Sequence, residues 1–350
     1  MNQRWVRRPE GSNWGDFGPD DQRGRLNLLT PGKVLQGVAE VSEGRSFCLS
    51  LPLDRPGRGL NPARHPPRRF ATIRHQGMPT HNFPMSVVIP GATDVINDDA
   101  VLLHTQVSTQ WDSLAHVGCM FDVMGDGNLV PVFYNGWRGD LHITAPRERP
   151  DAPELLRFED MEAKALGIQN MAETGVQGRG VMIDLHALFG RAGKLVGYDD
   201  LMRACESSGA TVETGDMVCL YTGFGDVVLE MGQDTDVKAL HASCARLDGR
   251  DEKLLQWITD SGLAALIADN YAVEQVPGTP CEPGGEGACA ALPLHQHCLF
   301  KLGVHLGELW HLSELAAWLR AHGRTRFLLT APPLRLPGAV GSPTTPVATV

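Results

Sequence analysis

Residues 104–116, HTQVSTQWDSLAH, contain four side chains that can bind or steer a cation: Gln106, Gln110, Asp112 and His116. The apolar, partly β-branched residues just before this segment indicate that a strand begins there, so we expect a strand over 101–112. Because alternate residues of a strand face the same side, Gln106, Gln110 and Asp112 would share one face. If the chain turns helical after Asp112, His116 lies one turn further, over the same point.

A carboxylate, an imidazole and two amides that converge suit one divalent metal ion, or the activation of a water molecule. The alternative is structural. Asp112 would then cap a helix that begins at Ser113, His116 would be a core histidine with its hydrogen bonds satisfied, and the glutamines would bond to backbone. The pattern of residues 104–116 alone leaves both interpretations open.

The segment resembles a variant of the H-x-G-T-H-x-D-x-P-x-H signature of the cyclase family, which includes bacterial kynurenine formamidases and isatin hydrolases. In this comparison the first two signature histidines fall on Gln106 and Gln110, and the T-Q-W-D form marks a distinct branch. Further blocks are similar to family motifs and follow in the family's order: an entry motif over 14–31, GRGVMIDL at 178–185, GVHLGELW at 303–310 and APPLRLPGAVGSP at 331–343.

The resemblance implies an α/β fold, a swivelling β/β/α barrel-like domain with a mixed sheet, which usually forms dimers or tetramers. It also implies that a late histidine and a glutamate complete the metal shell begun by Asp112 and His116. We assign these roles to His295 and Glu308, with His297 in reserve. The family's second ion uses the two signature histidines. Glutamine amides are far poorer ligands than imidazoles, so we expect one ion per chain, Zn²⁺ or Mn²⁺.

The composition is that of a globular protein without a membrane span. Hydrophobic residues make up 42% of the 350 residues, no apolar run could cross a bilayer, and no secretory signal is visible. The net charge of −10 argues against nucleic acid and favours a small-molecule partner. The eight cysteines include no CxxC pair, which indicates reduced thiols and a cytoplasmic location. Only Cys281 and Cys289 flank a loop that a disulfide could close.

We expect a single domain over 1–350, with an entry segment and one helix over 1–45. Other strands are expected at 46–53, 86–89, 130–134, 180–184 and 217–222, and helices at 154–166, 199–208, 248–261, 294–302 and 313–321. An arginine- and proline-rich loop is expected over 55–85, with six arginines and no acid between Arg55 and Arg74. It would either pack against an acidic surface or a second subunit, or act as a lid that attracts an anionic substrate.

The candidate substrate contacts are Trp111, His81, Phe133, Tyr134, Asp269 and Tyr271. Trp111 would also anchor its strand from the buried side, and His81 could reach into the site from the arginine-rich loop. The aromatic turn at 133–137 could form one wall of a pocket. Asp269 and Tyr271 follow a buried strand expected at 263–267, where polar groups often face a crevice. A turn cap is the equal alternative for them.

These features favour a metal-dependent, arylformamidase-like hydrolase of an amide, formamide, lactam or lactone bond in a small, aromatic acid; the resemblance places such chemistry in tryptophan catabolism. His116 and Gln110 are the candidate catalytic residues. His116 would bind the ion or move a proton, and Gln110 would hydrogen-bond the water or the substrate carbonyl. Two alternatives stay open: a metal-free relative that binds a small metabolite, and a non-hydrolytic lyase or isomerase in which Asp112 and His116 act as an acid–base pair.

Overall fold

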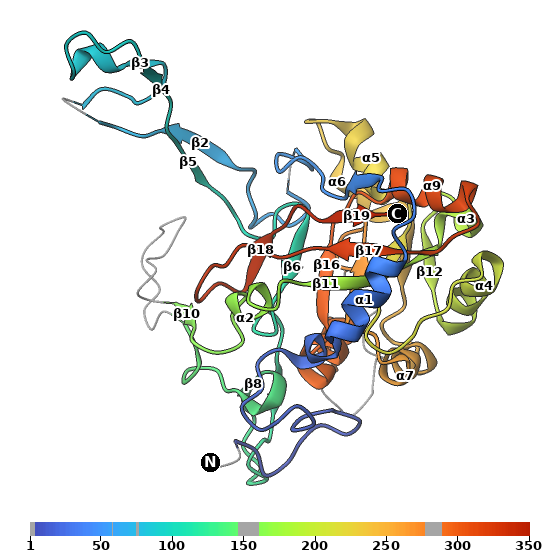
Figure 1. The fold of residues 1–350 in the computed structure, drawn as a ribbon. Helices are drawn as coiled ribbons and strands as arrows, with labels where there is room; N and C mark the ends of the chain where they lie inside the picture. The colour runs from blue at the N-terminus through green and yellow to red at the C-terminus, as the bar shows by residue number, and fades with distance from the viewer. Residues whose placement is uncertain (1–3, 58, 75–76, 146–160, 277–288) are drawn as a thin grey trace.

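The computed structural model describes residues 4–57, 59–74, 77–145, 161–276 and 289–350. A nine-stranded mixed sheet forms its centre (Figure 1). In spatial order the strands are β1 (Ser46–Cys48), β19 (Val347–Thr349), β17 (Arg326–Thr330), β11 (Gln177–Asp184), β13 (Met217–Tyr221), β15 (Ala265–Ala268), β16 (His305–Glu308), β6 (Gln110–Asp112) and β18 (Gly341–Pro343). β11, β13, β15 and β16 are parallel, and the other neighbours pair antiparallel.

The two middle strands of the parallel group, β13 and β15, are continuous apolar runs because both faces of the sheet are covered. β13 and β15 are buried at every position, as expected for strands between two layers. Alternate residues enter different cores: Val218 and Leu220 belong to one apolar cluster, whereas Met217 and Cys219 belong to the other. The period of two is that of a strand.

Helices supply both covering layers. They are α1 (Pro31–Ala39), α2 (Gln169–Ala172), α3 (His186–Phe189), α4 (Tyr198–Ser208), α5 (Phe224–Met231), α6 (Val237–Ala242), α7 (Glu252–Ser261), α8 (Pro293–His295) with the π-helix Gln296–Leu302, and α9 (Ser313–Ala321). α4 and α7 pack into the first cluster, and α9 packs into the second. Asp251 caps α7 by accepting from the backbone N–H groups of Lys253 and Leu254.

Short two-stranded sheets surround this centre. β7 (Cys119–Phe121) pairs with β8 (Val130–Val132), β9 (Ile143–Thr144) with β10 (Glu162–Ala163), and β12 (Lys194–Val196) with β14 (Ala245–Leu247). Two further pairs, β2 (Arg68–Ala71) with β5 (Asp99–Leu102) and β3 (Phe83–Pro84) with β4 (Val95–Ile96), form an arm that projects from the body (Figure 1). The segment over 55–85 is therefore a loop only in part.

Several expected elements differ from the structure. The strand expected over 101–112 is two strands, because β5 ends in the arm at Leu102 and β6 begins only at Gln110. The strand expected at 86–89 is replaced by the 3-10 helix Met85–Val87. The helix expected at 154–166 lies partly outside the described residues, and its described part contains the strand β10. Helices at 199–208, 248–261 and 313–321 are confirmed within a few residues at their ends.

Six cysteines are free thiols, as expected: Cys48, Cys119, Cys205, Cys219, Cys244 and Cys298. Cys289 is disulfide-bonded, and Cys281 lies outside the described residues. Within the described part of the chain, none of the helices has the length and apolar character needed to cross a membrane.

Candidate metal centre

The pairing of β6 with β16 brings the carboxylates of the site together. The register sets Gln110 opposite Glu308 and Asp112 opposite Leu306. His295, at the end of α8, approaches both carboxylates. The ligand atoms of Asp112, His295 and Glu308 all lie within 4.8 Å of one another, and all three side chains are buried. Three of the four predicted ligands therefore meet at one point.

His295 is held between two glutamates. Its Nε2 lies 3.2 Å from Glu308 Oε1 and 3.9 Å from Asp112 Oδ2. Its Nδ1 lies 2.7 Å from Oε1 of Glu274, which is also buried. Glu274 was absent from the sequence predictions. No spacing pattern indicates it, since its partner lies 21 residues further along the chain.

Each glutamine of the variant signature holds one carboxylate. Gln106 Nε2 donates to Asp112 Oδ1, and Gln110 Nε2 donates to Glu308 Oε2 at 2.9 Å. The opposite oxygen of Asp112, Oδ2, and the amide oxygen Oε1 of Gln110 are buried and have no hydrogen-bond partner among the described residues. A buried acceptor left unpaired costs roughly 1–3 kcal/mol. Two such acceptors beside an imidazole and a second carboxylate fit a divalent cation.

Charge and burial oppose each other in this cluster. Burial raises the pKa of Asp112, and the charges of His116 and His295 counteract this effect only in part. Burial acts in the same direction on Glu308, but the hydrogen bond and charge of His295 leave its pKa lowered. Burial would lower the pKa of His295, whereas hydrogen bonds to Glu274 and Glu308 raise it to about 10. The glutamates around His295 thus favour a positive charge between them.

His116 lies beside the cluster and is not among the three residues whose ligand atoms converge. Its ring centroid is 6.4 Å from that of His295, and the side chain is partly exposed. No helix follows Asp112; the backbone N–H of His116 donates to Ser113 O in a turn. Burial lowers the pKa of His116 more than the charge of Asp112 raises it. A neutral imidazole in this position can accept a proton.

His297, the reserve ligand, points away from the site. Its Nε2 lies 2.9 Å from Thr259 Oγ1, and burial lowers its pKa to about 4. The two histidines are only two positions apart on a helical segment, so their side chains leave it in different directions. Of the two histidines, His295 is therefore the one whose ring faces Asp112 and Glu308.

Trp111 is a core residue. Its side chain is 0% exposed, its Nε1 donates to Ala331 O at 2.7 Å, and its ring packs edge-on against Trp310. The expected anchoring of the strand is present, whereas the substrate contact is excluded by burial. Asp269 is also fully buried. It accepts from Thr222 N and Gly223 N, so the turn cap is the role that the structure shows.

The remaining substrate candidates divide into near and distant groups. Tyr134 is fully buried and packs beside Gly303, and the ring of half-buried Phe133 lies beside Gly118. Neither has a contact with the three ligands among the hydrogen bonds and ring contacts of the described residues. His81 is exposed on the arm, just before β3, and does not reach into the site as expected. Only Tyr271 lies close enough to the site for the charges of Glu308 and Asp112 to raise its pKa, although burial is the larger cause.

Arg64 brings the base of the arginine-rich segment to the site. Its Nη1 donates to the backbone oxygen of Gln106 at 3.0 Å. Burial has the largest effect on the pKa of His116 and of Glu308. The positive charge of Arg64 has a smaller effect, which lowers both pKa values. Within the described residues its guanidinium forms no ion pair, which leaves donors for an anion. In the sequence, nothing distinguishes Arg64 from the neighbouring arginines.

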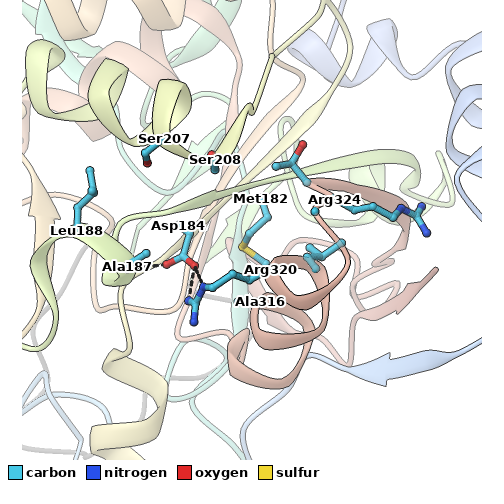
Figure 2. Close-up of a pocket in the computed structure, with 12 residues that line it drawn as sticks. Met182, Asp184, Ala187, Leu188, Ser207, Ser208, Ala316, Arg320 and Arg324 are labelled. Atoms are coloured by element: carbon cyan, nitrogen blue, oxygen red, sulfur yellow. Dashed lines mark hydrogen bonds and ion pairs between the residues drawn. The ribbon is translucent and has the colours of Figure 1, made fainter.

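A separate hollow of about 330 Å³ lies between β11, α4 and α9, and none of the candidate residues lines it (Figure 2). Asp184 points toward Arg320 in this view, and its carboxylate accepts from that guanidinium and from the backbone N–H of Ala187. The charged groups at the centre of this hollow therefore satisfy each other. The unpaired acceptors at Asp112 and Gln110 make the buried cluster the better candidate for a functional site.

Known proteins share this architecture. A crystal structure described as a novel cyclase is 30% identical to this chain, with 97% of this chain and 99% of that chain covered and a TM-score of 0.71. Isatin hydrolase A from Ralstonia solanacearum is 15% identical, with coverage of 91% and 97% and a TM-score of 0.51. An isatin hydrolase bound to the product analogue thioisatinate is 13% identical, with coverage of 92% and 99% and a TM-score of 0.53.

The likeness to the two isatin hydrolases is one of fold. Among curated proteins, none matches the chain by sequence. The expected α/β class with a mixed sheet is confirmed by the strand order and by the shared fold of the novel cyclase. The family described as "Putative cyclase" matches residues 48–275. With this match and the 30% identical structure over nearly the whole chain, the protein belongs to the cyclase family.

Proposed function

We propose that this protein is a metal-dependent hydrolase of an amide, formamide, lactam or lactone bond in a small anionic metabolite. The observation that carries the proposal is the buried cluster of Asp112, His295 and Glu308, with Asp112 Oδ2 unpaired at its centre. The isatin hydrolases among the structural relatives support hydrolysis as the reaction class.

One divalent ion, Zn²⁺ or Mn²⁺, would be held by Asp112, Nε2 of His295 and Glu308. Such an ion lowers the pKa of a bound water and polarises a carbonyl. The two glutamines occupy the positions of the signature histidines, and each already holds one carboxylate through its amide. We therefore propose a single ion, with the amides fixing the orientation of Asp112 and Glu308.

His116 and Gln110 would act on the reacting groups. His116 is partly exposed beside the ligands, and its lowered pKa keeps the imidazole neutral and able to take a proton from water. The Oε1 atom of Gln110 is an unpaired buried acceptor, so it could hold a water molecule in position. Which end of the amide faces the water depends on the hydrogen bonds around it.

Arg64 and Tyr271 support an anionic substrate. The Arg64 guanidinium lies beside the site without an ion-pair partner in the described chain, and its charge reaches Tyr271. A substrate carboxylate at this point would receive charge-assisted hydrogen bonds from Arg64. This is the part of the arginine-rich segment that fits the expected attraction of an anion.

The deciding experiment measures metal content and turnover together. Protein purified without added metal, then stripped by a chelator and reloaded with Zn²⁺ or Mn²⁺, is screened against formamides, lactams and lactones that carry a carboxylate. Hydrolysis that disappears on stripping and returns on loading is expected. Turnover that is indifferent to the chelator would favour the acid–base lyase or isomerase, and less than about a tenth of an equivalent of metal after loading would refute the metal site.

We also propose that the chain forms a homodimer or homotetramer through its arm. Six apolar side chains of the arm are at least half exposed: Phe70, Ile73, Val87, Ile89, Val95 and Val101. An isolated two-stranded ribbon is marginally stable in water, so burial of this surface against a second copy would stabilise it. Light scattering of Phe70→Asp and wild-type protein tests the association.

A further inference from the structure

Glu274 reaches the site through an unusual bend of the chain. The two residues before it, Ala272 and Val273, have φ values of 73° and 58°. This left-handed region is rarely adopted by residues other than glycine, and least by β-branched ones such as valine. Strain of this kind persists where the surroundings demand it, and it concentrates at functional sites. The bend turns the Glu274 side chain toward α8.

The Glu274 carboxylate accepts three hydrogen bonds from the start of α8, two of them from His295. Its Oε1 accepts from Nδ1 of His295 at 2.7 Å and from the His295 backbone N–H at 2.9 Å. Its Oε2 accepts from the backbone N–H of Leu294 at 3.0 Å. Ring and backbone of His295 are thus fixed by the same group.

Gly249 lies against the Glu274 carboxylate, and its missing side chain provides the space that the carboxylate occupies. A Cβ atom at Gly249 would collide with Oε2 of Glu274 and lie 2.9 Å from Pro293. No larger residue fits there unless Glu274 moves. The left-handed backbone at Ala272 and Val273 and the absence of a side chain at Gly249 therefore fix the position of the carboxylate together.

We propose that Glu274 is a positioning residue for the metal centre. It keeps the proton of the His295 imidazole on Nδ1, so that the lone pair of Nε2 points toward Asp112 and Glu308. This inference rests on the proposed function, because Nε2 is the atom that would face the ion. A carboxylate behind a histidine ligand fixes the ring and raises its basicity, and its loss typically weakens metal affinity 10–100-fold.

A purely structural role would have different consequences, and Asp251 provides the matched control. Its carboxylate accepts from three backbone N–H groups, those of Tyr198, Lys253 and Leu254. Like Glu274, which is buried, the partly buried Asp251 is an acid whose carboxylate accepts from backbone N–H groups at the start of a helix. No hydrogen bond of Asp251 in the described chain goes to a ligand of the cluster.

The test compares Glu274→Gln, Gly249→Ala and Asp251→Asn with the wild-type full-length chain. For each protein, chelator competition gives the dissociation constant of Zn²⁺, visible absorption of the Co²⁺ form reports ligand geometry, and thermal unfolding gives the melting temperature. We expect Glu274→Gln to weaken Zn²⁺ binding by about 10–100-fold and to change the Co²⁺ spectrum. Gly249→Ala, which displaces the carboxylate without removing it, should change both in the same direction.

Asp251→Asn should lower the melting temperature and leave Zn²⁺ affinity and the Co²⁺ spectrum unchanged. Zn²⁺ affinity of Glu274→Gln within about twofold of wild type would overturn the role of Glu274, since the loss of a carboxylate that supports a histidine ligand weakens binding more than that. Should Glu274→Gln fail to fold, Gly249→Ala decides by the same criterion. A wild-type chain that binds no ion would instead refute the proposed function itself.

Discussion

Replacement of His116 by asparagine separates catalysis from stability. The ring of His116 is partly exposed and has no hydrogen bond to a described residue, so its loss should cost about 1 kcal/mol of unfolding free energy or less. If the imidazole moves a proton, turnover should fall by about a hundredfold, which corresponds to about 2.7 kcal/mol of activation free energy. The effect on the barrier should thus exceed the effect on the fold.

The assay pairs a melting curve with a rate per folded molecule and a metal analysis, on the substrate that the panel returns. His297→Asn is the matched control, because this histidine is bonded to Thr259 on the far side of the helix. The control should lose about 1 kcal/mol of stability with its hydrogen bond and keep its rate. A His116→Asn protein that melts much earlier but keeps full activity per folded molecule would refute the reasoning.

Three further expectations follow from the site. Converting Gln106 and Gln110 together to histidine should raise the metal stoichiometry from one ion toward two, measured by elemental analysis; an unchanged value would show that this face does not serve a second ion. Arg64→Ala should raise KM for a carboxylate substrate by about tenfold, the scale of a lost charge-assisted hydrogen bond, with little effect on an uncharged analogue. In metal-free protein the pKa of His295 is raised from 6.5 to about 10. The contribution of the imidazolium to the free energy of unfolding should therefore be complete below pH 6.5 and be lost as the pH rises toward 10. Denaturant titrations in which the free energy of unfolding does not fall over this range would contradict that role.

The sequence led to the three residues that converge in the structure, because Asp112 lies in a short motif and the family resemblance adds a late histidine and a glutamate. Asp112 lies in the variant signature at the end of β6, and Glu308 is the last residue of β16, within the GVHLGELW block. The choice of His295 over His297 depended on which side of a helix faces the cluster, which spacing alone left open. In the structure it is His295 that faces Glu308 and Asp112, and Glu274 holds its ring through a contact that no local pattern could indicate.

One error comes from the continuity assumed for the strand over 101–112. An unbroken strand would have placed Gln106 on the ligand face by alternation, yet the chain leaves the arm and returns as a loop before β6. Gln106 still meets Asp112, because the loop folds back against Gly341, where a Cβ would come within 2.6 Å of the glutamine side chain. The expected substrate contact of Trp111 is wrong for another reason: its side chain lies in the core on the opposite face of β6, where its ring packs against Trp310.

The position of β6 between β16 and β18 also determines when the site can exist. This three-residue strand is paired on both sides by segments synthesised much later, and the Gln110–Glu308 hydrogen bond alone spans 198 residues. Contacts so distant in the chain carry a large loop-closure cost and form late. On the ribosome, Asp112 emerges long before either of its neighbouring strands. A growing chain therefore carries an incomplete set of candidate ligands until Glu308 and β18 have emerged, so an ion at this site would be loaded only after these segments are made.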